Sequence, residues 1–537
     1  NAPWDGRLLN RLFECWVRLF RKKRWDDLDR IREIIAGLRE DQKQYEDGVL
    51  NDSSNAENRA MALRLISLYH WAKATEVQAK YMLQGEPAGV TTLLNKHFES
   101  AIEAAAASSD SQLEILLRWL QIAGRQMVAD SIWWVARRIN SRVTKFVNEV
   151  TKQQALFELL PPQRAAIQEQ GLLDQAATAI VVDMPTSGGK TLLAQFRILQ
   201  ALNQFNQDES GKGWVAYVAP TKALTAQITR RLRRDFEPIG VKVEQLTGAI
   251  EVDAFEEDLL AQTEKAEAFD VLVATPEKLQ LIIRNKKVPR PLALVVMDEA
   301  HNIEDETRGL RIELLLATIK GECSTANFLL LMPFVEKPEV LARWLAQDID
   351  AGRPISFGTT PWKPNERIVG MFKAEADDSI NAGWHLKYET LTTTPKTIHL
   401  SGEHTVGDVK PLKVPKSRVI NTARHQQKGF NLQAAAMAKV MSERGTSIAV
   451  GRTVDNTWTM ARELKKVLPK INPIPDKVDL VQKFLAAEIS PNFELVDMLA
   501  YGIAVHNAGL SDEARALIEW LAEESELKVL CATSTIS

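Results

Sequence analysis

The feature that most constrains the fold occurs twice: a short apolar run that ends in a turn of small or charged residues. Residues 180–182 lead into Met-Pro-Thr-Ser-Gly-Gly-Lys-Thr at 184–191, and residues 292–297 lead into Asp-Glu-Ala-His at 298–301. Apolar runs this short, bounded by turn residues, are typical of buried strands. The sequence therefore predicts an α/β fold in which parallel strands end in chemically active turns.

The first turn predicts a phosphate-binding loop. A glycine-rich turn between a strand and a helix points its backbone N–H groups at one spot, where they can bind phosphate. Lys190 would then reach the β- and γ-phosphates of a nucleotide, and Thr191 would bind Mg²⁺. The candidate residues are Thr186, Ser187, Gly188, Gly189, Lys190 and Thr191. Met184 stands where the strict pattern has glycine, so an ordinary connection between strand and helix is the alternative for this turn alone.

The second turn, at residues 298–301, favours a catalytic site over an ordinary connection between strand and helix. Asp298, which follows the apolar run 292–297, would hold the same Mg²⁺ through water. Glu299 would orient and deprotonate the attacking water, and His301 completes the motif. A phosphate cradle and a pair of carboxylates at strand ends predict a nucleoside triphosphate hydrolase.

The pattern along the chain indicates four regions. Residues 1–150 carry apolar side chains at helical spacing, which predicts an all-helical N-terminal domain. Apolar runs alternate with amphipathic helices over 155–345 and again over 426–537, which predicts two parallel-sheet lobes, the second incomplete. Residues 346–425 are expected to form a β-rich connecting segment. The expected strands are 180–182, 215–218, 241–246, 271–274, 292–297, 328–331, 368–372, 386–391, 448–450, 503–505 and 529–531.

Composition narrows the class of protein. The net charge of −3 gives no overall basic field, so a nucleic-acid site must be a local groove. The three cysteines lack the spacing of a metal site, which predicts reduced thiols. No apolar run reaches the ~18 residues of a membrane span, and the start is not typical of a signal peptide. We therefore expect a cytoplasmic protein with no membrane partner.

Further stretches follow in a fixed order, and together they resemble superfamily 2 helicases, above all the Ski-like DExH branch that includes archaeal repair helicases. Gln163, in Leu-Pro-Pro-Gln, resembles the glutamine that recognises adenine. Residues 219–224, 274–279, 298–301, 506–510 and 529–537 resemble motifs Ia, Ib and II, a His-His-Ala-Gly-Leu segment with Asn507 for the second His, and the start of motif V. The resemblance covers about residues 155–537 and implies two RecA-like lobes with ATP and Mg²⁺ as cofactors.

The resemblance also implies a path for one nucleic-acid strand. Threonine hydroxyls and free N–H groups at strand ends suit a phosphodiester and do not read bases. The candidate residues are Pro220, Thr221, Lys222, Gly248, Thr275, Pro276, Glu277, His506 and Gly509. For His506, a packed turn histidine is an equal alternative. Such contacts suit DNA and RNA alike; of the two partners we favour DNA.

Two departures from the family pattern bear on the mechanism. Motif III of the family reads Ser-Ala-Thr before a Met-Pro or Leu-Pro pair, but here Leu331 runs directly into Met332-Pro333-Phe334. Either the motif has diverged or three residues are missing, and we expect the second, with a break between Leu331 and Met332. Motif VI, which carries an arginine finger, would follow motif V, and the chain ends before it, so we expect a longer protein.

Three functions remain open from the sequence. The leading one is an ATP-driven helicase or translocase on single-stranded nucleic acid, and the resemblance implies 3′-to-5′ movement. The second is a translocase on double strands. The third is a nucleotide-dependent nucleic-acid sensor that gates a partner effector, such as a nuclease in bacterial anti-phage defence, with residues 1–150 as the docking domain.

Overall fold

The computed structural model describes residues 4–50, 56–136, 140–185, 188–205, 212–246, 269–286, 288, 290–305, 309–333, 335–356, 368–377, 383–393, 423–443 and 445–533. The chain forms two compact units, Asn1–Pro364 and Asn365–Ser537. Within the described ranges, no helix has the length and apolar content needed to cross a bilayer.

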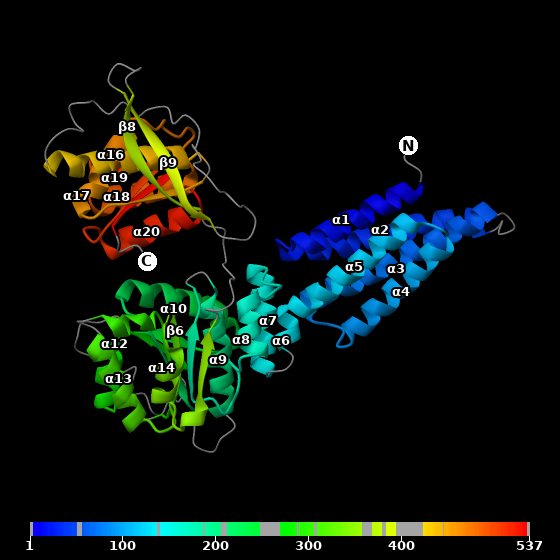
Figure 1. Cartoon of the computed structure of the whole chain (residues 1–537), viewed down its shortest axis with the longest axis horizontal. Coiled ribbons are helices and arrows are strands. Elements are labelled where there is room, and N and C mark those ends of the chain that lie inside the picture. Colours follow the sequence, from blue (N-terminus) through cyan, green and yellow to red (C-terminus); the bar gives the residue numbers. More distant parts are fainter. Residues whose placement is uncertain are drawn as a thin grey trace. The chain divides into compact units, whose positions relative to one another are not determined.

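The first unit begins with a helical region. Its helices are α1 (Trp4–Arg21), α2 (Trp25–Leu50), α3 (Ala56–Gln84), α4 (Val90–Ala107), α5 (Ser111–Asp130), α6 (Ile132–Ala136) and α7 (Ser141–Gln154). Figure 1 shows α1 to α5 as long neighbouring helices, followed by the short α6 and α7. Trp71 of α3 is fully buried among them, and Asp110 caps α5 by accepting a hydrogen bond from the Leu113 N–H at 3.1 Å. The predicted all-helical region is confirmed.

Seven parallel strands form the sheet of the first unit, in the order β3-β4-β2-β5-β6-β1-β7. They are β1 (Ala179–Asp183), β2 (Trp214–Val218), β3 (Val243–Gln245), β4 (Val271–Ala274), β5 (Leu292–Met297), β6 (Asn327–Met332) and β7 (Gly352–Ser356). The helices are α8 (Pro161–Gln168), α9 (Lys190–Phe205), α10 (Lys222–Phe236), α12 (Pro276–Arg284), α13 (Gly309–Glu322) and α14 (Pro338–Leu345), with 3₁₀ turns η1 (Glu237–Ile239), η2 (Ala300–Glu304) and η3 (Ile349–Ala351). Val182 packs into the core shared with α9 and α10, whereas Val181 packs into the core shared with α12 to α14.

Helix α7 joins the helical region to this sheet. Phe146 of α7 packs edge-on against Phe196 of α9 and Phe236 of α10, with ring centroids 5.8 Å apart in both pairs. The side-chain amide of Gln154 donates a hydrogen bond to Asp235 at 2.7 Å. The helical region therefore shares an apolar core with one face of the sheet.

The parallel arrangement brings the functional turns to one edge. In parallel sheets the carboxyl ends of the strands lie together, and ligands bind in the crevice outside them. β1 lies between β6 and β7, and Asp183 at its end is in register with Met332 and Ser356. The turns after β1, β2, β4, β5 and β6 therefore share an edge, and the predicted α/β fold of this lobe is confirmed.

The predicted interruption at motif III is wrong. β6 runs without a break through Leu331 and Met332, which are in register with Val182 and Asp183. The Met184 N–H donates a hydrogen bond to the Met332 carbonyl oxygen at 3.1 Å, so Met332 is bound into the sheet beside the phosphate loop. The continuous strand favours the alternative that motif III has diverged in this chain.

The second unit contains a smaller parallel sheet of order β10-β12-β11. Its strands are β10 (Ser447–Val450), β11 (Ile503–His506) and β12 (Val529–Ala532), and its helices are α16 (Ala423–Met441), α17 (Val454–Lys465), α18 (Asp476–Glu488), α19 (Glu494–Leu499) and α20 (Asp512–Glu523). The antiparallel strands β8 (Ile368–Asp377) and β9 (Gly383–Thr393) precede them along the chain. The predicted second parallel sheet is confirmed.

Candidate nucleotide site and nucleic-acid interface

The predicted phosphate loop connects β1 to α9 at the carboxyl edge of the first sheet. A Cβ added to Gly189 would lie 2.0 Å from Gln163 Nε2, and one added to Gly188 would lie 2.5 Å from Met184 Cγ. Gly189 also has a φ of +79°, which glycine adopts readily. The loop therefore presents backbone at these two positions, as a phosphate cradle requires. Thr186 and Ser187 lie outside the described residues.

Lys190 begins α9 and is buried, with 7% of the residue exposed. Its Nζ donates a hydrogen bond to the Met184 carbonyl oxygen at 3.2 Å. Burial lowers the pKa of this lysine, and the negative charges of Glu299, Asp298 and Asp183 oppose the shift. A buried cation at a glycine-rich loop is suited to bind the phosphates of a nucleotide.

Asp298 follows β5, and both of its carboxylate oxygens accept hydrogen bonds. The Tyr217 hydroxyl donates to Oδ2 at 3.0 Å, and the Glu299 N–H donates to Oδ1 at 2.9 Å. Burial raises the pKa of Asp298, while the hydrogen bond from Tyr217 lowers it. Burial, and next the charge of Asp298, raise the pKa of Tyr217, so its hydroxyl remains a protonated donor.

Glu299 has a left-handed backbone conformation, with φ 49° and ψ 41°. This region is uncommon for residues other than glycine and is often found where function constrains the backbone. The Asn302 side-chain amide donates to the Glu299 carbonyl oxygen at 2.7 Å and so holds the turn. The Glu299 carboxylate lies 3.2 Å from His301 Nδ1. Among the neighbouring carboxylates, Glu299 raises the pKa of Lys190 the most.

The oxygen donors at this edge fit a magnesium–nucleotide complex. Mg²⁺ is commonly held by one or two carboxylates together with phosphate oxygens. Asp298 supplies a half-buried carboxylate beside which a cation is favourable, and the half-buried Thr191 supplies a hydroxyl in the first turn of α9. Among the residues that the structure describes, no group of three His, Cys, Asp or Glu could hold a metal ion. In a magnesium–nucleotide complex, phosphate oxygens of the nucleotide would complete the coordination.

Gln163 connects the predicted adenine-recognition motif to the phosphate loop. It is 3% exposed, and its Oε1 accepts a hydrogen bond from the Leu160 N–H at 2.9 Å. Its Nε2 donates to the Gly189 carbonyl oxygen at 3.1 Å. The structure thus brings this motif against the loop, and adenine recognition by Gln163 stays a prediction.

The predicted nucleic-acid residues of the first unit stand at the starts of two helices. Thr221 is exposed and caps α10, its hydroxyl accepting from the Leu224 N–H at 3.2 Å. Thr275 precedes α12, is half-buried and makes no capping hydrogen bond with its side chain. Helix starts carry N–H groups without intrahelical partners, which suit phosphate. Of the remaining candidates, Lys222 and Glu277 are exposed, Pro220 is half-buried, Pro276 is buried, and Gly248 lies outside the described residues.

The predicted residues of the second unit lie at the carboxyl edge of its own sheet. His506 is 2% exposed, and its Nε2 lies 2.8 Å from Glu519 Oε1. The Asn507 side chain donates to the Thr457 hydroxyl at 3.1 Å and accepts from the Gly509 N–H at 2.9 Å. His506 and Asn507 therefore shape the turn, whereas Gly509 is exposed. The burial of His506 favours the alternative of a packed turn histidine.

Sequence reasoning missed several residues at these edges. Tyr217 reaches Asp298 from β2, as described above. Asp183, at the end of β1, accepts hydrogen bonds from the Val335 N–H at 3.3 Å and the Ser356 hydroxyl at 3.1 Å. Arg452 is exposed and follows β10 at the edge that also carries the turn after β11. Asp183 directly follows the predicted strand 180–182 and Arg452 lies two residues after 448–450, whereas Tyr217 lies inside the run 215–218 and nothing local marks it.

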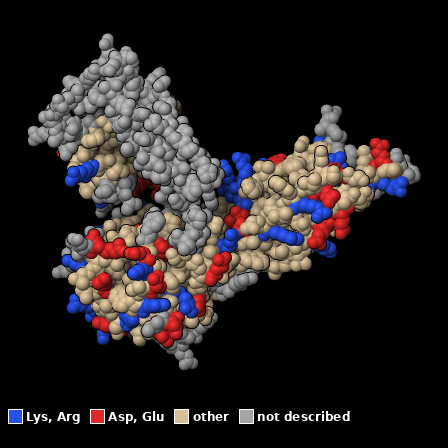
Figure 2. Space-filling model, in the orientation of Figure 1, with Lys and Arg blue, Asp and Glu red and all other residues tan. Residues whose placement is uncertain are grey.

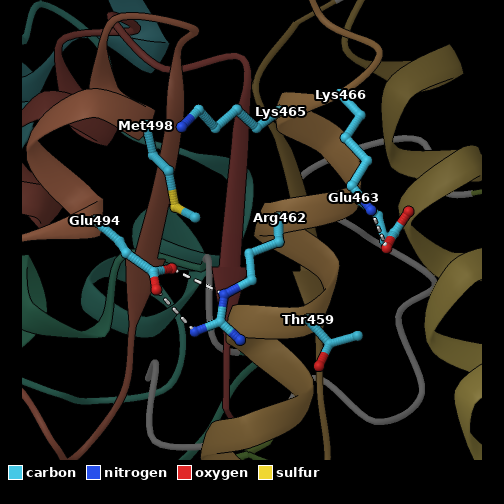
Figure 3. Close-up of a pocket in the computed structure, with 7 residues that line it drawn as sticks. All are labelled: Thr459, Arg462, Glu463, Lys465, Lys466, Glu494 and Met498. Atoms are coloured by element: carbon cyan, nitrogen blue, oxygen red, sulfur yellow. Dashed lines mark hydrogen bonds and ion pairs between the residues drawn. The ribbon is translucent and has the colours of Figure 1, made fainter.

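A surface pocket in the second unit contains none of the predicted site residues (Figure 3). Its volume is about 520 Å³, and it is lined by Thr459, Arg462, Glu463, Lys465, Lys466, Glu494 and Met498. Arg462 donates to both carboxylate oxygens of Glu494, at 2.8 and 3.1 Å, and Lys466 Nζ lies 2.7 Å from Glu463. Neighbouring carboxylates pair with Arg462 and Lys466, so the pocket is poorly suited to bind phosphate.

A parallel sheet whose carboxyl edge carries a phosphate loop, a buried lysine and an Asp-Glu pair defines the class of P-loop nucleotide-binding proteins. Residues 160–332 match the model of the DEAD/DEAH box helicase family. This match, together with the relatives below, confirms the predicted resemblance to superfamily 2 helicases, a family whose DEAD/DEAH box domain implies ATP binding.

The relatives include archaeal and bacterial proteins. The chain is 26% identical over 395 residues to ATP-dependent DNA helicase Hel308 of Methanocaldococcus jannaschii, covering 72% of this chain and 28% of that protein. It is 26% identical over 397 residues to Hachiman protein HamB of Bacillus cereus, covering 72% and 33%. It is 25% identical over 398 residues to Hel308 of Methanococcus vannielii, covering 74% and 46%. The chain thus spans less than half the length of these relatives.

A solved structure also matches. It is the DUF1998 helicase MrfA bound to DNA and AMPPNP, at 17% sequence identity and a TM-score of 0.44, over 74% of this chain and 44% of that one.

Proposed function

We propose that the protein is an ATP hydrolase that works as a helicase or translocase on one strand of nucleic acid. The observation that supports this most is the shared edge of the first sheet. Lys190 and Asp298 stand at that edge with the predicted nucleotide, and Thr221 and Thr275 stand at it with the predicted strand. Because both sites lie on one rigid sheet, ATP hydrolysis can change the contacts with the nucleic-acid strand.

Each residue of the nucleotide site has a role in this proposal. Lys190 neutralises the β- and γ-phosphates, and Gln163 selects adenine. Asp298 and Thr191 hold Mg²⁺, which when bound neutralises charge on the transferred phosphoryl group. Glu299 accepts the proton of the attacking water, and its neighbour His301 steadies the carboxylate at 3.2 Å.

Strand binding is proposed to rest on local phosphate contacts. Thr221, Lys222 and Thr275 offer hydroxyl, ammonium and helix-start N–H groups that suit a phosphodiester without reading bases. Figure 2 shows Lys and Arg intermingled with Asp and Glu over the visible described surface, so contacts of this local kind are more effective than a broad field. Two of the relatives are named DNA helicases, which supports DNA as the polymer.

Movement requires a second grip on the strand. We assign the ATP-binding lobe to residues 155–345 and the second lobe to 426–537, joined by 346–425. The exposed Arg452 and Gly509, at the carboxyl edge of the second sheet, are the candidates for that grip. The 3′-to-5′ direction rests on the family resemblance.

The test is ATP turnover and duplex unwinding by the full-length protein. Single-stranded DNA, duplex DNA and RNA are added separately, and duplexes with a 3′ or a 5′ single-stranded tail are compared. We expect single strands to stimulate turnover and only the 3′-tailed duplex to be unwound. Stimulation by blunt duplex without unwinding would instead identify a double-strand translocase.

A second candidate function is a nucleic-acid sensor that gates a partner effector through residues 1–150. Helix α1 exposes Phe13, Val17 and Phe20 at 41%, 50% and 67%, and helix α5 exposes Ile115, Trp119 and Ile122 at 61%, 77% and 66%. Each set follows the i, i+4, i+7 spacing of one helix face, and exposed apolar faces often bind proteins. The relative named Hachiman protein HamB supports a role in bacterial defence.

The sensor reading is tested by capture of partners from the source cells with the full-length protein and with a Trp119→Glu variant. Loss of one captured effector with the variant, together with turnover that no nucleic acid stimulates, would favour the sensor. Stimulated turnover and no captured effector would favour the translocase.

A further inference from the structure

Asp298 is bonded to two successive residues of strand β2. The Tyr217 hydroxyl donates to Asp298 Oδ2 at 3.0 Å, across a sequence separation of 81 residues. The Asp298 N–H donates to the Val218 carbonyl oxygen at 2.8 Å. Strand β2 therefore holds Asp298 through the side chain of one residue and the main chain of the next.

The ring of Tyr217 is fixed in place by its burial. The residue is 0% exposed and belongs to the apolar core that the sheet shares with α9 and α10. Buried phenols need an acceptor, so a purely structural explanation is that Asp298 serves the tyrosine. The alternative is that Tyr217 orients Asp298. This has chemical consequences, because Asp298 is the carboxylate assigned to Mg²⁺.

The two hydrogen bonds fix the orientation of this carboxylate. Oδ2 accepts from Tyr217, and Oδ1 accepts from the Glu299 N–H at 2.9 Å. Mg²⁺ demands near-ideal octahedral geometry, so the direction in which the remaining lone pairs point determines how well the ion is held. Partners that orient a metal-binding side chain typically change metal affinity by about 10–100-fold.

We infer that Tyr217 is a positioning residue for the magnesium–nucleotide complex and links it to the nucleic-acid loop that follows β2. The inference rests on the proposed function. After β2 ends at Val218, the chain continues through Pro220 to Thr221 at the start of α10. A displacement of this loop by a bound phosphate is carried along β2 to Asp298 through both bonds.

The test uses Tyr217→Phe in the full-length protein, which removes the hydroxyl and keeps the buried ring. Binding of a fluorescent ATP analogue is titrated with Mg²⁺. We expect affinity without Mg²⁺ to be unchanged and the Mg²⁺ concentration for half-maximal binding to rise about tenfold. Tyr81→Phe, which changes another buried tyrosine in the helical region, is the matched control and should behave as the unchanged protein.

A double-mutant cycle separates positioning from a general loss of stability. In an Asp298→Asn background, Tyr217→Phe should change the Mg²⁺ requirement little further, because residues that act as a unit are not additive. An unchanged Mg²⁺ requirement in Tyr217→Phe, or full additivity in the cycle, would overturn the inference and leave the proposed function standing. Absence of Mg²⁺-dependent nucleotide binding in the unchanged protein would overturn both.

Discussion

The side-chain nitrogen of Gln163 donates a hydrogen bond to the carbonyl oxygen of Gly189 at 3.1 Å. Gln163 precedes β1, so this hydrogen bond attaches it to the loop that follows β1. The same side chain accepts from the Leu160 N–H at 2.9 Å. These two hydrogen bonds therefore couple the predicted adenine-recognition motif to the predicted phosphate loop.

Gln163→Ala is expected to weaken ATP binding. Removal of the side chain leaves a buried N–H and a carbonyl oxygen without this partner, at a cost of about 1–3 kcal/mol, which corresponds to about 5- to 150-fold in affinity. Preference for ATP over GTP should fall as well. Titration with both nucleotides measures this, and Gln168→Ala, at an exposed position of the same helix, is the control. Equal ATP affinity in both variants would contradict the assignment.

Glu299→Gln is expected to keep nucleotide binding and to slow turnover by about 10²–10⁴-fold, because an amide cannot accept the proton of water. Asp298 still holds the metal. Single-turnover kinetics and nucleotide titration separate the two effects, with Glu304→Gln, an exposed residue at the end of η2, as the control. Joint loss of binding and turnover would show that Glu299 is structural.

Thr275→Val should weaken binding of single-stranded DNA and leave stability nearly unchanged, because this hydroxyl makes no capping bond. Thr221→Val should lower stability as well, by about 0.5–2 kcal/mol, since Thr221 caps α10. Thr221→Ser keeps the cap and is the control.

The affinity for single-stranded DNA is measured at several salt concentrations. It is expected to decrease as salt rises, whatever the DNA sequence, because the contacts are to phosphates. Strong preference for one sequence over its scramble would argue against this interface.

His70 and His97 predict a pH-dependent stability in the helical region. Their Nδ1 atoms lie 3.1 Å apart, so the pair can share one proton between them. Burial and then Lys96 lower the pKa of His70. Burial lowers the pKa of His97, as do His70, Lys73 and Lys96, and Glu76 opposes them.

Because both pKa values are depressed on folding, the unfolded chain binds more protons as pH falls through its own value of about 6.5. The free energy of unfolding should therefore decrease below about pH 6.5 and be fully retained above it. Thermal unfolding at pH 7.5 and 5.5 measures this. In a His70→Gln/His97→Gln variant, the stability should differ less between pH 7.5 and pH 5.5 than in the unchanged protein. An equal difference in both proteins would assign the pH effect to other groups.

Strands with uninterrupted apolar runs could be predicted from the sequence almost to the residue. β4 and β5 coincide with the expected 271–274 and 292–297, because strands buried on both faces admit apolar residues throughout. β7 was missed, since Arg353 and Pro354 interrupt any such pattern. It is an edge strand paired with β1 alone, and an edge tolerates proline.

The residues of the candidate site also fall into those that the sequence predicts and those that only the fold brings together. Lys190, Asp298 and Glu299 belong to short motifs that can be recognised locally. The partners of Asp183 are 152 and 173 residues away, and Tyr217 is 81 residues from Asp298, so only the packing of distant strands brings them together. The expected break at motif III was wrong because it rested on the family pattern of three residues before Met332-Pro333, whereas β6 continues directly from Leu331 to Met332.

Turnover of ATP by the full-length protein and its Lys190→Ala variant, with and without single-stranded DNA, tests the central claim most directly. Lys190 is the buried cation at the phosphate loop, so its loss should abolish hydrolysis and strongly weaken nucleotide binding. We predict Mg²⁺-dependent turnover that single-stranded DNA stimulates in the unchanged protein, and none above background in the variant. Wild-type turnover in Lys190→Ala would contradict the account.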